Sequence, residues 1–260
     1  MTRPIALAPV LALFVGLCYS EKAPTFEVAA ITPCKPGTPA PPGEHNGMEQ
    51  FTFPGGRFSA RATTVKYLLE WAYGIIPAQH SEGPGWMGDD RYDINAKAAT
   101  EHATDDEMKL MAQALLADRF KLKFHHEARE APVLILAPGK TPPKLFPPKP
   151  EEKYALKVAP LTGQDQKIVS YHVTATRFSF AQLNLTFARL LGRVIVNQTG
   201  LEGDFDFTID LTPDENQPNP LDPSLLVSAL REQLGFNVKS AKAPVDYLAI
   251  DSVEKVAAGN

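Results

Sequence analysis

The chain contains 260 residues, of which 44% are hydrophobic and 22% charged, and this balance excludes a chain that is disordered throughout. Its length suffices for two modest hydrophobic cores, because domains commonly contain about 100–150 residues. The formal net charge of −4 gives no support to nucleic-acid binding, which requires a basic surface to neutralise phosphates.

Residues 1–20 are typical of an export signal. Arg3 supplies a positive start, residues 5–17 form an apolar centre, and Cys18-Tyr19-Ser20 matches a cleavage site. The apolar stretch is shorter than the roughly 20 residues that a membrane-spanning helix needs. We therefore expect cleavage near Ser20 and a periplasmic or secreted mature chain without a transmembrane segment. Cys34 would then be the remaining cysteine, which excludes an intrachain disulfide.

The first half of the chain alternates between strand-like and helix-like patterns. Thr64 is suited to cap a helix, because its hydroxyl can accept a hydrogen bond from a free backbone amide. Acidic residues at 105–107 favour a helix N-terminus, where the macrodipole is positive. The predicted elements are a strand at 26–31, short extended pieces at 51–53 and 57–60 around a Pro54-Gly55-Gly56 turn, a helix from Thr64 to Gly74, a strand at 91–96, a helix at 105–118, and a hairpin with strands at 120–124 and 132–137.

A proline-rich segment separates the two halves. Proline fixes φ and removes a backbone donor, so neither a helix nor a central strand is expected there. We predict a stiff linker or a long exposed loop at 141–165, a first domain at 21–140 with a proline-rich N-terminal loop, and a second domain at 166–257. The prolines are Pro138, Pro142, Pro143, Pro147, Pro148 and Pro150.

The second half contains a similar series of segments. Ser179 is a predicted helix cap, and residues 204–211 alternate between apolar and acidic or hydroxyl side chains, as in a strand with one packed and one solvated face. The predicted elements are a strand at 169–175, a helix from Ser179 to Gly192, strands at 193–196 and 204–211, a helix at 224–234, and strands at 236–239 and 247–253.

The two halves share the order of their elements and one short signature. Ala131-Pro132-Val133 and Ala243-Pro244-Val245 occur at matching places near the end of each half. Self-similarity of this kind indicates repeated architecture. The predicted fold class is α+β, with two tandem repeats of a small sandwich that packs two helices against a mixed sheet.

No catalytic residue, metal ligand or cofactor site is predicted. His125 and Glu127 share one side of a predicted strand, but their spacing is not that of a helical His-Glu-x-x-His zinc motif. Cys34 has no neighbouring histidine to activate it, and no serine lies in a Gly-x-Ser-x-Gly turn. The acidic row lacks the glycine turn and the bidentate glutamate of an EF-hand, which favours a solvated strand face; its members are Asp204, Asp206 and Asp210.

Motifs spread over most of the chain carry a family resemblance. The sequence resembles the uncharacterised "soil-associated" family of exported bacterial proteins, a domain of unknown function without assigned catalytic residues. Similar domains are attached to membrane sensor metallopeptidases, whose zinc motif this chain lacks. The motifs include Phe26-Glu27-Val28-Ala29, Gly55-Gly56-Arg57-Phe58, Gly83-Pro84-Gly85-Trp86, Arg91-Tyr92-Asp93-Ile94, Asn197-Gln198-Thr199-Gly200 and Ala243-Pro244-Val245.

Each half is more distantly similar to the short N-terminal domain of secretins and TonB-type receptors, which implies a unit that binds protein partners. The first hypothesis is therefore a non-enzymatic binding module that contacts a protein partner in the cell envelope through exposed sheet edges. The alternative is an enzyme or small-ligand-binding protein that uses a cleft between the two halves. A third hypothesis is a structural envelope protein. The residues predicted to line the cleft are Trp86, Arg91, Asp93 and Asp206.

Overall fold

The computed structural model describes residues 24–39, 51–163, 167–213 and 222–256, so the predicted export signal lies outside the described residues. The described chain is a mixed α+β structure with three sheets and two hydrophobic cores. Among the described residues, no helix has the length and apolar character needed to cross a membrane.

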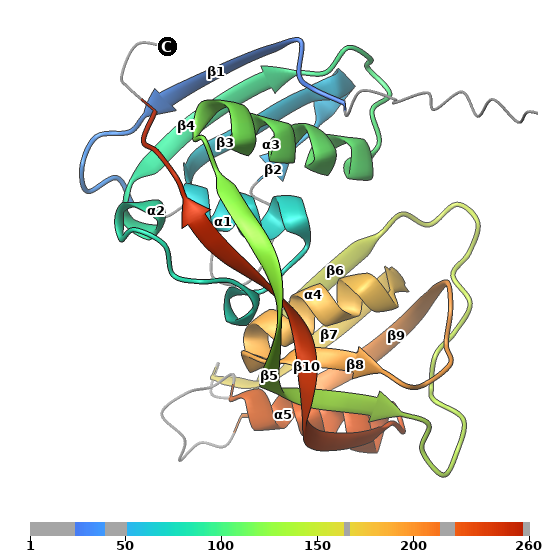
Figure 1. The fold of residues 1–260 in the computed structure, drawn as a ribbon. Helices are drawn as coiled ribbons and strands as arrows, with labels where there is room; N and C mark the ends of the chain where they lie inside the picture. The colour runs from blue at the N-terminus through green and yellow to red at the C-terminus, as the bar shows by residue number, and fades with distance from the viewer. Residues whose placement is uncertain (1–23, 40–50, 164–166, 214–221, 257–260) are drawn as a thin grey trace, which may run out of the picture.

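The first body is an antiparallel sheet of order β1-β4-β3-β2 with helices packed on one face (Figure 1). Strand β3 leads directly into α1, where the Tyr67 amide donates to Thr64 Oγ1 at 3.1 Å, and Gly74 ends α1 with a φ of 62°. Both predicted helices of this half are confirmed. The elements are β1 (Val28–Pro33), β2 (Phe51–Thr52), η2 (Pro54–Gly56), β3 (Arg57–Thr64), α1 (Val65–Tyr73), η3 (Pro77–Gln79), α2 (Trp86–Asp89), β4 (Arg91–Lys97) and α3 (Asp105–Arg119).

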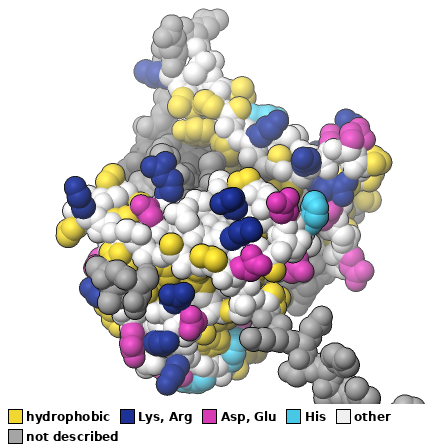
Figure 2. All heavy atoms as spheres, turned by 90° about the horizontal axis from the view of Figure 1, so that it is seen from above, with side chains coloured by type: hydrophobic (Ala, Val, Ile, Leu, Met, Phe, Trp, Pro, Cys, Tyr) yellow, Lys and Arg dark blue, Asp and Glu magenta, His cyan; other side chains and the backbone are white. Residues whose placement is uncertain are grey.

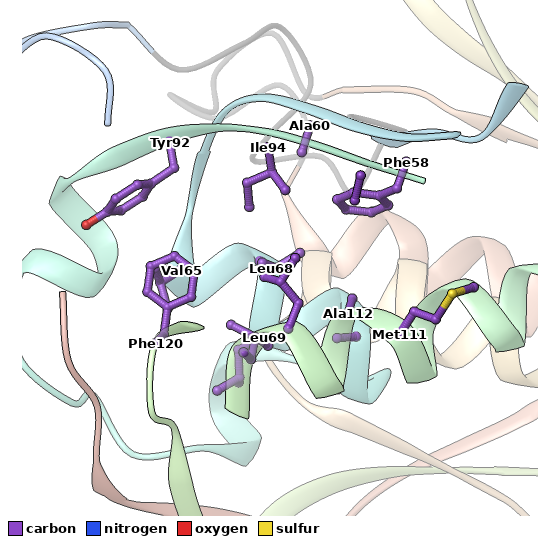
Figure 3. Close-up of a cluster of buried hydrophobic side chains, with 14 of the residues drawn as sticks. Phe58, Ala60, Val65, Leu68, Leu69, Tyr92, Ile94, Met111, Ala112 and Phe120 are labelled. Atoms are coloured by element: carbon purple, nitrogen blue, oxygen red, sulfur yellow. The ribbon is translucent and has the colours of Figure 1, made fainter. Parts of the chain in front are cut away.

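Side chains from the sheet and from both long helices interlock in the first core (Figure 3). Phe58 and Ile94 come from strands β3 and β4, Leu68 from α1 and Ala112 from α3, and all four are buried. Each large apolar side chain buried in this way contributes about 1.5–3 kcal/mol relative to an exposed position. Apolar packing therefore fixes the helices to the sheet.

The second body has a smaller antiparallel sheet of order β6-β7-β9, with α4 packed against it. Ser179 at the end of β7 begins α4 through a reciprocal capping box with Gln182, and Gly192 ends the helix. The helix predicted at 224–234 is present as α5 followed by the wider π turn η4. The elements are β6 (Ala155–Thr162), β7 (Ile168–Ser179), α4 (Phe180–Leu191), β8 (Val194–Asn197), β9 (Asp204–Leu211), α5 (Pro223–Ser228) and η4 (Ala229–Gln233).

A long two-stranded ribbon joins the two bodies. Strand β5 (Lys123–Ala137) runs from the first body to the second, and β10 (Asn237–Ser252) returns beside it in antiparallel pairing (Figure 1). Strand β8 adds to β5 in parallel at the second body, and His80 forms a parallel bridge to Leu248 at the first. Each end of the ribbon is thus joined by a short parallel segment.

Because the ribbon strands pass from one body to the other, each body is completed by both halves of the chain. Leu248 of β10 is buried in the first core, whereas Leu136 of β5 and Val238 of β10 are buried in the second. At the centre of the ribbon Ala131 pairs directly with Ala243, so that the two Ala-Pro-Val signatures lie side by side.

The hairpin predicted at 120–124 and 132–137 is wrong. The chain does not turn between these two segments, because Lys123–Ala137 is a single continuous strand. The strands predicted at 236–239 and 247–253 are likewise the two ends of β10. In each case the polar middle of the strand resembles a turn in the sequence. It stays extended because the partner strand satisfies its backbone groups along the whole length.

Strand β6 lies inside the segment predicted as a linker at 141–165. Its proline, Pro160, is tolerated because β6 is at the edge of its sheet, where a missing backbone N–H does not interrupt a central ladder. Residues 138–154 before it form no regular helix or strand, and Phe146 makes an isolated bridge to Asp206, as expected for an extended connection.

Gly55 and Gly56 provide a matched test of backbone packing in the η2 turn. Both have positive φ, but a Cβ on Gly56 would lie 2.2 Å from the Thr100 carbonyl oxygen, whereas nothing lies within 4 Å of one on Gly55. Gly55→Ala should cost about 1–2 kcal/mol of unfolding free energy for the left-handed backbone alone. Gly56→Ala should cost about 1–3 kcal/mol more, because the Thr100 backbone must move. Urea denaturation measures both values, and equal costs would contradict this account.

Candidate functional site: an aromatic cleft between the two bodies

A cavity of about 180 Å³ lies between the first and second bodies. Its first wall consists of aromatic side chains from β2, the turn after it and α1. Its second wall comes from one face of α4 and from the residue preceding β6. The principal apolar lining residues are Phe51, Phe53, Tyr67, Trp71, Tyr154 and Leu185.

The aromatic wall is a cluster of packed rings. The Trp71 ring lies 4.7 Å from the Phe51 ring and 5.6 Å from the Phe53 ring, measured between centroids. On the opposite wall, the Tyr154 ring stacks on buried Phe178 at 5.4 Å. Rings held in this way offer flat apolar faces whose orientation is already fixed.

Polar groups from the start of α3 and from one face of α4 border the same cavity. Asp105 and Lys109 lie in the first turns of α3, and Gln182, Thr186 and Arg189 follow one another along α4 at intervals of three and four residues. That spacing places the three α4 side chains on one face of the helix. The cavity therefore combines aromatic walls with hydrogen-bonding groups along one side.

A buried ion cluster lies at the junction of the two bodies. Glu70 of α1 accepts a short hydrogen bond from Arg189 Nη1 of α4, and its other carboxylate oxygen lies 3.1 Å from His80 Nε2. The exposed fractions of the Glu70, His80 and Arg189 side chains are 3%, 1% and 11%. The second ring nitrogen of His80 lies 2.8 Å from the Ser81 carbonyl oxygen, so both ring nitrogens have oxygen partners.

Arg189 borders two cavities. It lines the aromatic cleft and also a second cavity of about 620 Å³, which Glu70 and Arg91 help to line. The Arg189 guanidinium carbon lies 5.3 Å from the centroid of the Tyr67 ring, within the range of a cation–π interaction. Ion pairing and ring contact thus hold this cation between the bodies.

Two of the residues predicted to line the cleft instead support the backbone of separate sheets. Asp93 accepts a hydrogen bond at 2.8 Å from the amide of Ala62, which has a φ of 48° in a bulge of β3. Asp206 accepts one at 2.7 Å from the amide of Arg177, which also has a φ of 48°, in a bulge of β7. Each carboxylate stabilises an unfavourable left-handed residue. Neither is among the residues that line the cleft.

The other two predicted residues lie in the first body. Arg91 Nη1 donates to the Ala62 carbonyl at 2.7 Å, so Arg91 and Asp93 hold the same bulge. Trp86 is half-buried against the first core, with Lys255 Nζ 5.6 Å from its ring centroid. The structure thus brings Arg91 and Asp93 together, places Asp206 in the other body, and lines the aromatic cleft with none of the four. Their ligand-binding role stays a prediction.

The histidine and acidic clusters form ion pairs on the ribbon and on β9. His125 contacts Asp251 at 2.8 Å and Glu127 at 3.0 Å, and its hydrogen bonds to Glu127 and Asp251 raise the pKa of the imidazole. Within the described residues, no group of three or more His, Cys, Asp or Glu side chains is arranged to hold a metal ion. Burial raises the pKa of the Cys34 thiol, and nearby Asp93 raises it further, so this thiol is not activated.

Glu70 and Arg189 are the site residues that sequence reasoning missed. Both stand among apolar residues on predicted helices, and Glu70 is flanked by Leu69 and Trp71. A charged residue on the apolar side of a helix is a detectable signal, because an unpaired charge is rarely buried. The sequence does not reveal that the partner lies 119 positions away.

Comparison with known proteins gives one match. A family model described as "Protein of unknown function (DUF3738)" matches residues 66–253, which include nearly all of α1, the whole of α4 and the whole ribbon. Neither the curated proteins nor the solved structures contain a match.

Glu70 and Glu82 provide a matched test of the ion cluster, because each pairs with a cationic side chain but Glu70 is buried and Glu82 is 87% exposed. Glu70→Ala should lower the unfolding free energy by about 3–5 kcal/mol, since it leaves the buried Arg189 without its counter-charge. Glu82→Ala should lower it by about 0–1 kcal/mol, because exposed ion pairs contribute little. Urea denaturation of both variants gives the comparison. Similar losses would show that Glu70 does not stabilise the junction.

Proposed function

The chain belongs to the family described as protein of unknown function (DUF3738), and we propose that it is an exported, non-enzymatic binding protein whose ligand occupies the aromatic cleft. The single observation that carries this proposal is the pre-formed ring cluster of Phe51, Phe53 and Trp71 opposite Tyr154 and Leu185. Ligand sites are typically concave and apolar, with a few fixed polar groups.

The composition of the lining favours binding over catalysis. Among the described residues that line the cleft, none is a serine, cysteine or histidine, so the usual nucleophiles and the commonest general base are missing there. Asp105 and Lys109 are ionisable, but both lie at the start of α3 beside solvent. Their positions suit ligand recognition.

We also propose that the chain consists of two copies of one unit that exchange their last strands. The equivalent bulges at Ala62 and Arg177, each held by an aspartate on the neighbouring strand, support this. The direct pairing of Ala131 with Ala243 supports it further, because that pair would map onto itself under a two-fold axis through the ribbon. The cleft then lies where α1 of one copy faces α4 of the other.

Export rests on the sequence of residues 1–20, which has the charge and apolar pattern of a cleavable signal. The resemblances to "soil-associated" proteins and to the short domain of secretins and TonB-type receptors are consistent with a role in the cell envelope. They remain predictions about this chain.

Binding in the cleft can be tested by filling it. Thr186 lines the cavity from α4, so Thr186→Phe should occupy the space that a ligand ring would take. We expect some single-ring compounds in an NMR fragment screen to shift resonances of Phe53, Trp71 and Leu185, and we expect Thr186→Phe to abolish those shifts. Thr208→Phe, on the exposed face of β9, should leave them unchanged. The proposal fails if no compound produces these shifts, or if they persist in Thr186→Phe.

A second candidate function is pairing of a partner strand with β6. This strand is at the edge of its sheet and exposes Val158 at 39% and Leu161 at 46%. Open edges with apolar side chains can accept a further strand. Lys157 and Pro160 on the same strand weigh against it, because such residues commonly protect edges.

If a partner strand pairs with β6, one partner protein should lie next to this strand. With a photocrosslinking residue at exposed Ala159 of β6, cells that export the protein should give a discrete adduct with one envelope protein. Leu161→Asp should remove that adduct, because it places a charge on the contact face. The same crosslinker at Thr208 serves as the control. The absence of an adduct at Ala159, or its insensitivity to Leu161→Asp, would exclude edge pairing.

A further inference from the structure

We propose that the ligand of the aromatic cleft is a small monocarboxylate that carries a single ring, with its carboxylate held by Arg189 and Lys109. This inference rests on the proposed function and adds the chemical class of the ligand. Its three supports are the size of the cavity, the charge of its lining and the unused hydrogen-bonding capacity of Arg189.

The size of the cavity limits the ligand to about one ring. The volume of about 180 Å³ is close to the roughly 150 Å³ of an apolar cavity that holds benzene. The flat faces of Phe53 and Trp71 suit an aromatic or similarly planar ring, which can stack on them in offset or edge-to-face geometry. A disaccharide or a fused polycycle would exceed this space.

The charge of the lining favours an anion. Lys109 and Arg189 contribute two positive charges and Asp105 one negative charge, although the whole chain has a net charge of −4. Charges of both signs are mixed over the face of the molecule that Figure 2 shows. Arg189 also pairs with Glu70 at the edge of the cleft, so the lining offers two cationic donors without a large excess of positive charge. Two such donors match the single charge of a carboxylate better than a doubly charged phosphate.

Arg189 has hydrogen-bonding capacity that the protein does not use. A guanidinium carries five N–H donors, yet within the described residues only Nη1 of Arg189 donates, to Glu70. The side chain is only 11% exposed, so the remaining donors have little access to bulk water. A buried guanidinium in this state is pre-organised for a planar carboxylate.

Glu70 and Lys109 have different parts in this arrangement. Glu70 is a positioning residue, because it does not line the aromatic cleft but holds the Arg189 guanidinium at its edge. Lys109 lines the cleft directly, and its only ion pair within the described residues is a long 3.5 Å contact to Asp106, whose side chain is 91% exposed. Its ammonium group is therefore available to a second anion.

The test compares benzoate with benzamide, which has nearly the same shape and no charge. In a Trp86→Phe background, Trp71 is the only tryptophan left of the two in the chain, so its fluorescence reports on the cleft. We expect benzoate to bind at least about tenfold more tightly than benzamide, because charge-assisted hydrogen bonds are stronger than neutral ones. Acetate should bind more weakly than benzoate, since it lacks the ring.

Variants identify which cation recognises the carboxylate. Lys109→Gln should reduce the benzoate preference several-fold. Arg189→Gln should nearly abolish the benzoate preference. This substitution is combined with Glu70→Gln so that no unpaired charge stays buried. Lys239→Gln is the matched control, because Lys239 is exposed on β10 and lines neither cavity that Arg189 borders.

The outcomes separate this inference from the proposed function. If benzamide binds as tightly as benzoate and Thr186→Phe blocks both, the cleft binds rings but the carboxylate assignment is wrong. If the benzoate preference survives in both the Lys109 and the Arg189 variants, the assignment of the anchoring cations is wrong. If neither ring compound binds while the protein is folded, both proposals fail.

Discussion

The antiparallel pairing of β5 with β10 completes both hydrophobic cores at once. Leu248, near the end of the chain, is buried among residues of the first body, and Leu136, from the middle of the chain, is buried in the second. Neither half of the sequence contains a whole core, so the bodies depend on each other for apolar burial. Separating them would expose buried leucine and valine side chains, each worth about 1.5–3 kcal/mol.

The ribbon also explains why charge can be buried between the bodies. It fixes their spacing, so that α1 and α4 bring Glu70 and Arg189 into direct contact. Burying two charges is costly unless the geometry is fixed and the remaining polar atoms are satisfied. His80 meets part of that requirement, and its own position is set by its bridge to Leu248 of β10. The ion cluster is therefore a consequence of the ribbon.

The aromatic cleft lies beside this fixed junction. Its walls belong to different bodies, with Trp71 on α1 and Leu185 on α4, so the cavity exists only in the assembled chain. Arg189 is shared by the ion cluster and the cleft. A ligand that contacts Arg189 would therefore touch the same side chain that joins the two bodies, and its binding should stabilise their arrangement.

The sequence by itself determined the local elements. Thr64, Ser179 and the two glycines that end α1 and α4 marked those helices correctly, because caps depend on residues three or four positions apart. Tertiary structure alone decided that β5 and β10 are continuous strands shared by two cores, and that Asp93 and Asp206 support bulges. These outcomes depend on partners far apart in the chain, and a local pattern cannot tell a turn from an extended segment that a distant strand pairs.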